Sequence, residues 1–200
     1  DEVNQRVERL SARKILQKFQ LEYSAPCASL IDDLSFFEPS EGLCPSLRGD
    51  DIVGVDKSFI KTLEQITGIT ISSLDDFERA IESRLAAFIE KGCKYTDHAL
   101  DDGFSYLRED GRNDKRFEAI LEGKELSKTE RLHLSSRILR CLAGLYAKNG
   151  LSMQLHIGAK RKTSSRLRKV AGPAGGYAAI GRCVNVSALT ELLNDIEKQQ

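Results

Sequence analysis

The spacing of hydrophobic residues predicts a helix at the start of the chain. Apolar side chains recur there at intervals of three and four, with charged residues between them, which is the pattern of an amphipathic helix. These positions are Val3, Val7, Leu10, Ile15, Leu16 and Phe19. The pattern predicts a helix over residues 2–19, and the apolar stretch Leu21–Ala25 that follows it predicts a strand.

A second helix has clear boundary signals. Ser73 followed by Asp76 is a typical N-terminal cap, and Gly92 can adopt the left-handed conformation that ends a helix. Between them, apolar residues recur at helical spacing at Phe77, Ile81, Leu85, Phe88 and Ile89. Residues 93–96 then predict the start of a strand, followed directly by Asp97 and His98.

A third helix and its strand have the same layout. Ser127 and Glu130 form a capping box, and Gly150 ends the helix. Its apolar positions are Leu134, Ile138, Leu142 and Leu145. The apolar run Leu151–Leu155 predicts a strand that leads into His156.

The two units place a histidine at the same distance from the glycine. Gly92 precedes His98 by six residues, and Gly150 precedes His156 by six residues. A helix, a glycine and a short apolar strand, repeated, are typical of parallel β/α units. We therefore expect an α/β fold with each histidine at the carboxyl end of its strand. Ligands bind at that edge in open parallel sheets and in (β/α)₈ barrels.

The segment 26–56 has a weaker pattern. It predicts a helix near Leu30–Phe37, a strand at Leu43–Ser46 and a polar loop over residues 47–51. Arg48 follows the predicted strand, so we expect it near the same edge of the sheet. An ordinary surface arginine is the alternative.

Asp97, His98 and His156 are the strongest chemical candidates. Carboxylate and imidazole groups at neighbouring strand ends can act as general acid and base on a sugar or an acid, or can bind or support a metal ion. The alternative is structural: one histidine caps a helix and the other satisfies a buried carbonyl group.

Basic residues gather after the second of these strands. They are Lys160, Arg161, Lys162, Arg166, Arg168 and Lys169. Such a cluster can bind a carboxylate or a phosphate, for which arginine offers a planar pair of donors. Arg161 is the strongest candidate because it follows His156 by five residues. A solvated basic helix is the alternative for the others. Proteins that bind single-stranded nucleic acid use aromatic side chains to stack on the bases. Around this cluster Tyr177 is the only aromatic residue.

Composition narrows the class of protein. The chain has 200 residues, of which 40% are hydrophobic and 30% charged, with 30 basic and 30 acidic side chains. Zero net charge gives no general attraction to a polyanion, so we expect no nucleic-acid partner. No apolar run reaches the roughly 18–20 residues of a bilayer span, so we expect no membrane segment and a cytoplasmic location. The five cysteines form no CxxC pair, which favours reduced thiols.

Several segments resemble the uronate isomerase family. Met153–Arg161 reads MQLHIGAKR and is similar to the family's MQxHIGAxR, and Ala171–Pro173 with Gly176 and Tyr177 lies where the family continues into a segment like GPDxGFDSI. Gly92–Leu100 reads GCKYTDHAL and resembles GCxxSDHAL. Pro45–Asp50, PSLRGD, is similar to PSxRPD, and Leu21–Leu34 lies where the family has a strand ending in TTDDPxDSL. The resemblance spans essentially the whole chain, and MQLHIGAKR is its most specific part.

This resemblance implies a distorted (β/α)₈ barrel of the amidohydrolase superfamily. We therefore expect an α/β fold that is a helix-rich, partial TIM barrel, about strands two to five with their helices. Residues 1–200 form a single segment of it, incomplete at both ends. The resemblance also implies an isomerase. It interconverts D-glucuronate and D-fructuronate, or D-galacturonate and D-tagaturonate, by moving a proton between C2 and C1.

For individual residues, the resemblance implies that Asp97, His98 and His156 are catalytic and that Arg48 and Arg161 bind the uronate. The family uses a divalent metal ion, which we expect to be zinc. Its ligands, paired histidines of the first strand and an aspartate of the last, have no counterpart in this segment. His156 is the residue that could support that metal indirectly, through one of its ligands. A small uronate is the expected partner, and a homo-oligomer is compatible with the resemblance.

The chain also departs from the family pattern. Pro26–Leu30 stands in place of TTDDP, and Ala174 and Ala178 stand where the family has the aspartates of GPD and FDSI. Such a barrel needs about 250 residues, so we expect this segment to be inactive alone and to expose strand edges. Two alternatives remain: a non-catalytic sugar-acid-binding or interaction protein on the same scaffold, and a metal-dependent amidohydrolase.

Overall fold

The computed structural model describes residues 11, 14–15, 18–19, 21–172 and 175–199. The helix expected over residues 2–19 therefore lies mostly outside the described residues. The elements in chain order are β1 (Cys27–Ser29), the 3₁₀ turn η1 (Pro39–Glu41), β2 (Ser46–Arg48), α3 (Asp50–Val53), α4 (Lys57–Thr67), α5 (Leu74–Glu90), β3 (Tyr95–Leu100), α6 (Asn113–Leu121), α7 (Lys128–Lys148), β4 (Ser152–Ile157), β5 (Ala159–Lys160), α8 (Ser165–Ala171), β6 (Ala179–Ile180) and α9 (Val186–Glu197). No helix among them is both long and apolar enough to cross a membrane.

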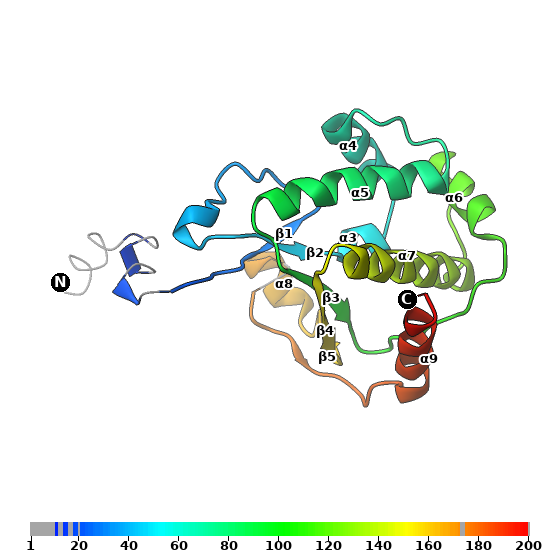
Figure 1. Cartoon of the computed structure of the whole chain (residues 1–200). Coiled ribbons are helices and arrows are strands. Elements are labelled where there is room, and N and C mark those ends of the chain that lie inside the picture. The colour runs from blue at the N-terminus through cyan, green and yellow to red at the C-terminus, as the bar shows by residue number, and fades with distance from the viewer. Residues whose placement is uncertain (1–10, 12–13, 16–17, 20, 173–174, 200) are drawn as a thin grey trace.

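Four parallel strands form the central sheet, in the order β1-β2-β3-β4 (Figure 1). Parallel neighbours need crossover connections, which helices provide. Helices α3, α4 and α5 connect β2 to β3, and α6 and α7 connect β3 to β4. The expected repeat of β/α units is therefore confirmed. A separate antiparallel pair, β5 and β6, follows the sheet.

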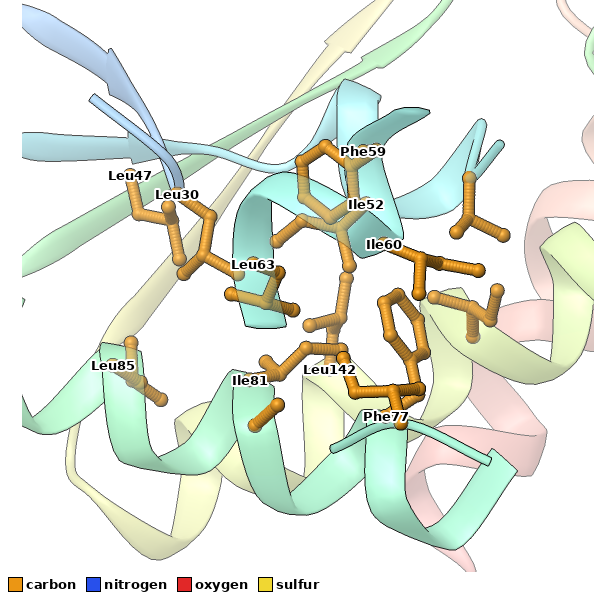
Figure 2. Packing of buried hydrophobic residues seen from close by; sticks show 14 of the residues in the cluster. Leu30, Leu47, Ile52, Phe59, Ile60, Leu63, Phe77, Ile81, Leu85 and Leu142 are labelled. Atoms are coloured by element: carbon orange, nitrogen blue, oxygen red, sulfur yellow. The ribbon is translucent and has the colours of Figure 1, made fainter. Parts of the chain in front are cut away.

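Helices cover one face of the sheet with an apolar core (Figure 2). Leu47 of β2 and Leu30 just after β1 meet side chains from α3, α4, α5 and α7. Fully buried members include Ile52, Leu63, Phe77, Leu85 and Leu142. Burying a side chain of this size contributes about 1.5–3 kcal/mol. The helical layer therefore fixes which face of each strand is apolar, and leaves the opposite face for polar groups.

The predicted boundaries of α5 and α7 are confirmed. The Ser73 side chain accepts a hydrogen bond from the backbone N–H of Asp76, and the capping box at Ser127 is complete. Gly92 has a φ of 79° and Gly150 a φ of 66°, the left-handed conformation that glycine adopts without strain. The same signals place β3 and β4 directly after these helices.

The predicted strands before residue 56 are displaced. Strand β1 lies at Cys27–Ser29 instead of Leu21–Ala25, and β2 starts at Ser46, where the predicted strand ends. Each of these strands has three residues. A strand of this length is too short to show a recognisable alternation of apolar and polar residues. Helix α3 occupies part of the predicted loop at 47–51.

The helix predicted near Leu30–Phe37 is wrong, because this segment forms turns. Asp32 accepts a hydrogen bond from the backbone N–H of Ser29, and Asp33 accepts one from that of Ser35. Short aspartate side chains that bond to nearby backbone groups compete with helix formation.

The strand register separates neighbouring residues onto opposite faces. Asp97 pairs with Gln154, and His98 pairs with Leu155. Side chains alternate along a strand, so His156, two residues after Gln154, lies on the same face as Asp97. His98 lies on the opposite face, toward the helices. The two histidines also lie within their strands, and each strand continues beyond its histidine.

Strand β4 has one open edge within the described part of the chain, because β3 is its single partner there. Ile157 at its end is 46% exposed. The exposed strand edge expected from the sequence is therefore present.

Candidate active site

The carboxylate of Asp97 is the centre of a polar cluster on the open face of the sheet. The Asp97 side chain is 1% exposed. Its Oδ2 contacts the guanidinium of Arg48 and accepts a hydrogen bond from Sγ of Cys27 at 3.6 Å. Its Oδ1 lies 2.7 Å from Nδ1 of His156. A thiol, a guanidinium and an imidazole thus surround one buried carboxylate.

The register of the parallel strands assembles this cluster. Arg48 of β2 lies directly beside Asp97 of β3. On the other side of Arg48, Ser29 of β1 is its partner, and Cys27 lies two residues earlier on the same face. His156 reaches the cluster from β4. Four consecutive strands therefore each contribute one side chain to the same face. Arg48 is the last residue of β2 and His156 lies next to the last residue of β4, whereas Asp97 lies within β3 and Cys27 begins β1.

The surrounding charges set the protonation of Arg48 and Cys27. Burial alone would lower the pKa of Arg48, but its contacts with Asp50 and Asp97 raise it. The guanidinium therefore stays charged next to both carboxylates. Burial, followed by the charge of Asp97, raises the pKa of the Cys27 thiol. Cys27 is thus a neutral hydrogen-bond donor here and not a thiolate nucleophile.

His98 lies outside this cluster. It is 2% exposed, and its Nε2 lies 3.1 Å from Oη of Tyr146 on α7. Burial lowers the pKa of His98 to about 4. The sequence groups Asp97, His98 and His156 in one site, whereas the structure brings Asp97 together with His156 and places His98 on the other face of the sheet.

Arg161 forms an ion pair with a different carboxylate. Its Nε lies 2.9 Å from both Oδ1 and Oδ2 of Asp101, just after β3. Close by, Arg182 pairs with Asp102 in the same way, with Nε 3.1 Å from Oδ1. The remaining residues of the basic cluster are exposed on β5, α8 and the loop between them.

A cavity of about 660 Å³ connects Arg48 with Arg161. Its walls come from α3, from the end of β3 with the loop after it, and from α7. Lining side chains include Arg48, Asp50, His98, Phe104, Leu139 and Arg161. Of the Asp97 cluster, Arg48 lines the cavity, whereas Asp97 and His156 are not among its lining residues. Two arginines on one wall can together bind a small carboxylate.

The described residues do not contain a group of three or more His, Cys, Asp or Glu side chains arranged to hold a metal ion. Asp97 instead lies between Arg48 and His156. The donor set of the described residues therefore does not fit a resident metal.

Sequence reasoning missed three members of the site. Asp50 binds Arg48 with Oδ2 2.6 Å from Nε, and Cys27 and Tyr146 complete the contacts of Asp97 and His98. Asp50 lies two residues after Arg48, and that spacing was a usable signal. Cys27 and Tyr146 carried none, because the contact of each depends on strands or helices far away in the sequence.

Comparison with known proteins identifies the family. A family model described as glucuronate isomerase matches residues 2–200. The chain belongs to this family. It is 31% identical to the uronate isomerase of Caldanaerobacter subterraneus, over 95% of this chain and 43% of that protein. It is 28% identical to that of Bacteroides fragilis, over 100% of this chain and 45% of that protein. The family resemblance read from the sequence is confirmed.

Solved structures show the same fold. The uronate isomerase of Thermotoga maritima superposes with a TM-score of 0.87 at 22% identity, over 99% of this chain and 46% of that one. The glucuronate isomerase of Caulobacter crescentus gives 0.76 at 20% identity, over 92% of this chain and 40% of that one. The expected partial, helix-rich α/β barrel is confirmed. The chain spans under half the length of the relatives it matches. That residues 1–200 form one segment of a larger barrel stays a prediction.

Proposed function

We propose that the whole protein is a uronate isomerase and that this segment supplies much of its sugar-acid site. The observation that carries the proposal is the buried carboxylate of Asp97, held between Arg48 and His156 on one face of four parallel strands. Family membership supports it. The substrate is D-glucuronate or D-galacturonate, and the product is the corresponding ketose acid.

The reaction moves one proton from C2 to C1 and one from O2 to O1. A base takes the proton from C2 of the open-chain aldehyde, the released electron pair forms the C1–C2 double bond, and O1 gains a proton to give an enediol. O2 then loses its proton and C1 gains one, which yields the ketose. Both steps suit a group that exchanges protons near neutral pH.

His156 is the group that we assign to this proton transfer. Its side chain is 56% exposed on the open face of the sheet, whereas that of Asp97 is 1% exposed. Since Nδ1 of His156 lies 2.7 Å from Oδ1 of Asp97, we assign Nε2 to the substrate. Asp97 then orients the ring and stabilises it whenever it carries a second proton, as carboxylates do for catalytic histidines in general.

Arg48 and Arg161 are assigned to the substrate carboxylate. Both line the cavity, and the guanidinium group offers two parallel donors that match a carboxylate. Arg48 is already paired with Asp50 and Asp97, and Arg161 with Asp101. Those aspartates fix the direction of the two guanidinium groups before the substrate arrives.

The proposal places the metal ion outside this segment. The divalent ion, zinc in our proposal, is held by residues elsewhere in the whole protein, since the side chains described here form no ligand set for it. No step of this scheme depends on it. We further propose a cytoplasmic enzyme that acts on a small uronate, without a nucleic-acid partner.

An assay of the whole protein tests the proposal. With D-glucuronate and added zinc, we expect conversion to D-fructuronate at an ordinary enzymatic rate, of order 1–10³ s⁻¹. The 200-residue chain alone is expected to give no turnover. Binding of a uronate by the whole protein without conversion would contradict the isomerase proposal and favour a sugar-acid-binding protein.

Arg161 and Arg182 form a matched pair for a binding test. Each is paired with an aspartate of the same turn, Asp101 or Asp102, but Arg161 lines the cavity and Arg182 is 81% exposed. We expect Arg161→Lys to raise the KM for D-glucuronate about tenfold, because lysine loses the planar pair of donors. Arg182→Lys should leave KM within about twofold. Equal effects of the two substitutions would remove Arg161 from the site.

A further inference from the structure

His98 fills the space between β2 and α7 on the helical face of the sheet. Its Nε2 lies 3.1 Å from Oη of Tyr146, and both side chains are almost completely buried. The edge of its ring is turned toward Gly49, the residue that joins β2 to α3. His98 is therefore held between a helix and the chain segment that carries Arg48.

Gly49 shows what the imidazole ring determines. The backbone of Gly49 has φ −91° and ψ −3°, a conformation open to other residues. A Cβ atom at this position would lie 2.0 Å from Cε1 and 2.5 Å from Nδ1 of His98. Glycine is thus required by the ring and not by the backbone. The ring sets how closely the chain leaving β2 approaches β3.

This close approach brings Arg48 to Asp97. The backbone N–H of Gly49 donates to the carbonyl oxygen of Asp97 at 2.9 Å. The backbone N–H of Ala99 donates to Oδ1 of Asp50 at 2.8 Å. The two residues that flank His98 in β3 are therefore hydrogen-bonded to the two residues that follow Arg48. The guanidinium of Arg48 contacts the carboxylates of Asp50 and Asp97.

We propose that His98 is a positioning residue: its ring, fixed by Tyr146, sets the path of the chain at Gly49 and so holds the guanidinium of Arg48 on Asp97. For the roles of Arg48 and Asp97, the inference rests on the proposed function. For the way they are held, it rests on the geometry of this chain. It assigns His98 a role different from the acid or base that the sequence suggests.

The charge state of His98 agrees with this role. Burial lowers its pKa to about 4, and Arg48 acts in the same direction, against the opposing charges of Asp50 and Asp97. Burial also raises the pKa of the Tyr146 hydroxyl, so the pair is neutral at pH 7. A neutral ring bonded to a neutral hydroxyl is suited to packing and orientation.

The contact between Gly49 and His98 can be tested directly on the 200-residue chain. The readout is the ¹H–¹⁵N signal of the Arg48 Nε–H group, assigned by its loss in Arg48→Lys. We expect Gly49→Ala to broaden or shift this signal, because the new methyl group displaces the ring. In Gly49→Ala/His98→Ala the ring is absent, so we expect the alanine at position 49 to cause no further change beyond that of His98→Ala.

A matched truncation separates positioning from general loss of packing. Leu134→Ala removes a buried side chain from α7, the helix that carries Tyr146. We expect it to lower the melting temperature without altering the Arg48 signal. His98→Ala should alter both. An unchanged Arg48 signal in His98→Ala, or effects of Gly49→Ala and His98→Ala that simply add, would overturn the proposal.

Kinetics of the whole protein distinguish positioning from proton transfer. His98→Phe/Tyr146→Phe keeps two packed rings and removes both polar partners together, so neither is left unpaired. We expect its kcat to fall by less than tenfold, whereas His98→Ala raises KM by about tenfold or more through misplaced Arg48. A loss of about 10² or more in kcat for the double variant would make His98 an acid or base and overturn the proposal.

The kinetic assay and the measurement of the Arg48 signal test different claims. If the wild-type protein does not convert or bind a uronate, the proposed function is wrong, yet the Arg48 signal still decides whether His98 holds the ion pair. If turnover is present and the Arg48 signal does not depend on His98, the function stands and the positioning role is wrong.

Discussion

Asp97→Asn is expected to lower the kcat of the whole protein about 10³-fold, within the range that general acid–base groups contribute. Asparagine keeps the shape of the side chain and its place in β3. It removes the negative charge that Arg48 contacts, and it presents no carboxylate to Nδ1 of His156. The imidazole then loses both its orientation and the partner that stabilises its protonated form. Steady-state kinetics with D-glucuronate measure the effect.

Asp114→Asn is the matched control for this loss. Asp114 lies in the first turn of α6, is exposed, and is not part of the cavity or the Asp97 cluster. We expect its kcat to stay within about twofold of the wild type. Both variants should keep the wild-type circular dichroism spectrum. If Asp97→Asn retains more than about a tenth of the wild-type kcat, Asp97 is not needed for proton transfer.

The two β/α units were predictable because their signals are local. The caps at Ser73 and Ser127 and the glycines at 92 and 150 each act within a few residues of the helix that they bound. A helix with both ends marked and a regular apolar face leaves few alternatives for the strand that follows. The family resemblance then added the overall architecture, which no local signal carries.

The region before residue 56 was not predictable for a physical reason. Strands β1 and β2 have three residues each, and their places are fixed by pairing, β1 with β2 and β2 with β3, rather than by their own pattern. Aspartate turns at Asp32 and Asp33 replace the helix that the apolar spacing suggests. Long-range pairing and side-chain bonds to the backbone both override a weak local preference.

The candidate site was predictable in its membership more than in its grouping. Arg48, Asp97 and His156 were named from the sequence, and the structure brings them together. Asp97 and His98, however, are neighbours within a strand, where adjacent side chains point to opposite faces. The sequence pattern predicts both residues at the end of a strand, where alternation between the two faces is not expected, but both lie within β3. Cys27 and Tyr146 could not be found, since tertiary packing alone brings them to the site.

The pH dependence of stability gives the second large expected effect. His98 has a pKa of about 4 in the folded chain, compared with about 6.5 for an unperturbed histidine. The unfolded chain therefore binds a proton at this residue first as the pH falls. The stabilisation is complete above pH 6.5 and is lost as the pH decreases toward 4. This gap corresponds to roughly 3 kcal/mol of unfolding free energy.

Urea unfolding between pH 7 and pH 4 measures this loss on the 200-residue chain. Other groups titrate in the same range, so the quantity to compare is the difference between the wild type and His98→Phe/Tyr146→Phe. We expect the double variant to lose less stability than the wild type over this range, because no imidazole must be protonated on unfolding. The charged groups that face His98, namely Asp50, Asp97 and Arg48, are unchanged in the variant. Equal losses in the two proteins would mean that His98 is not buried in its neutral form.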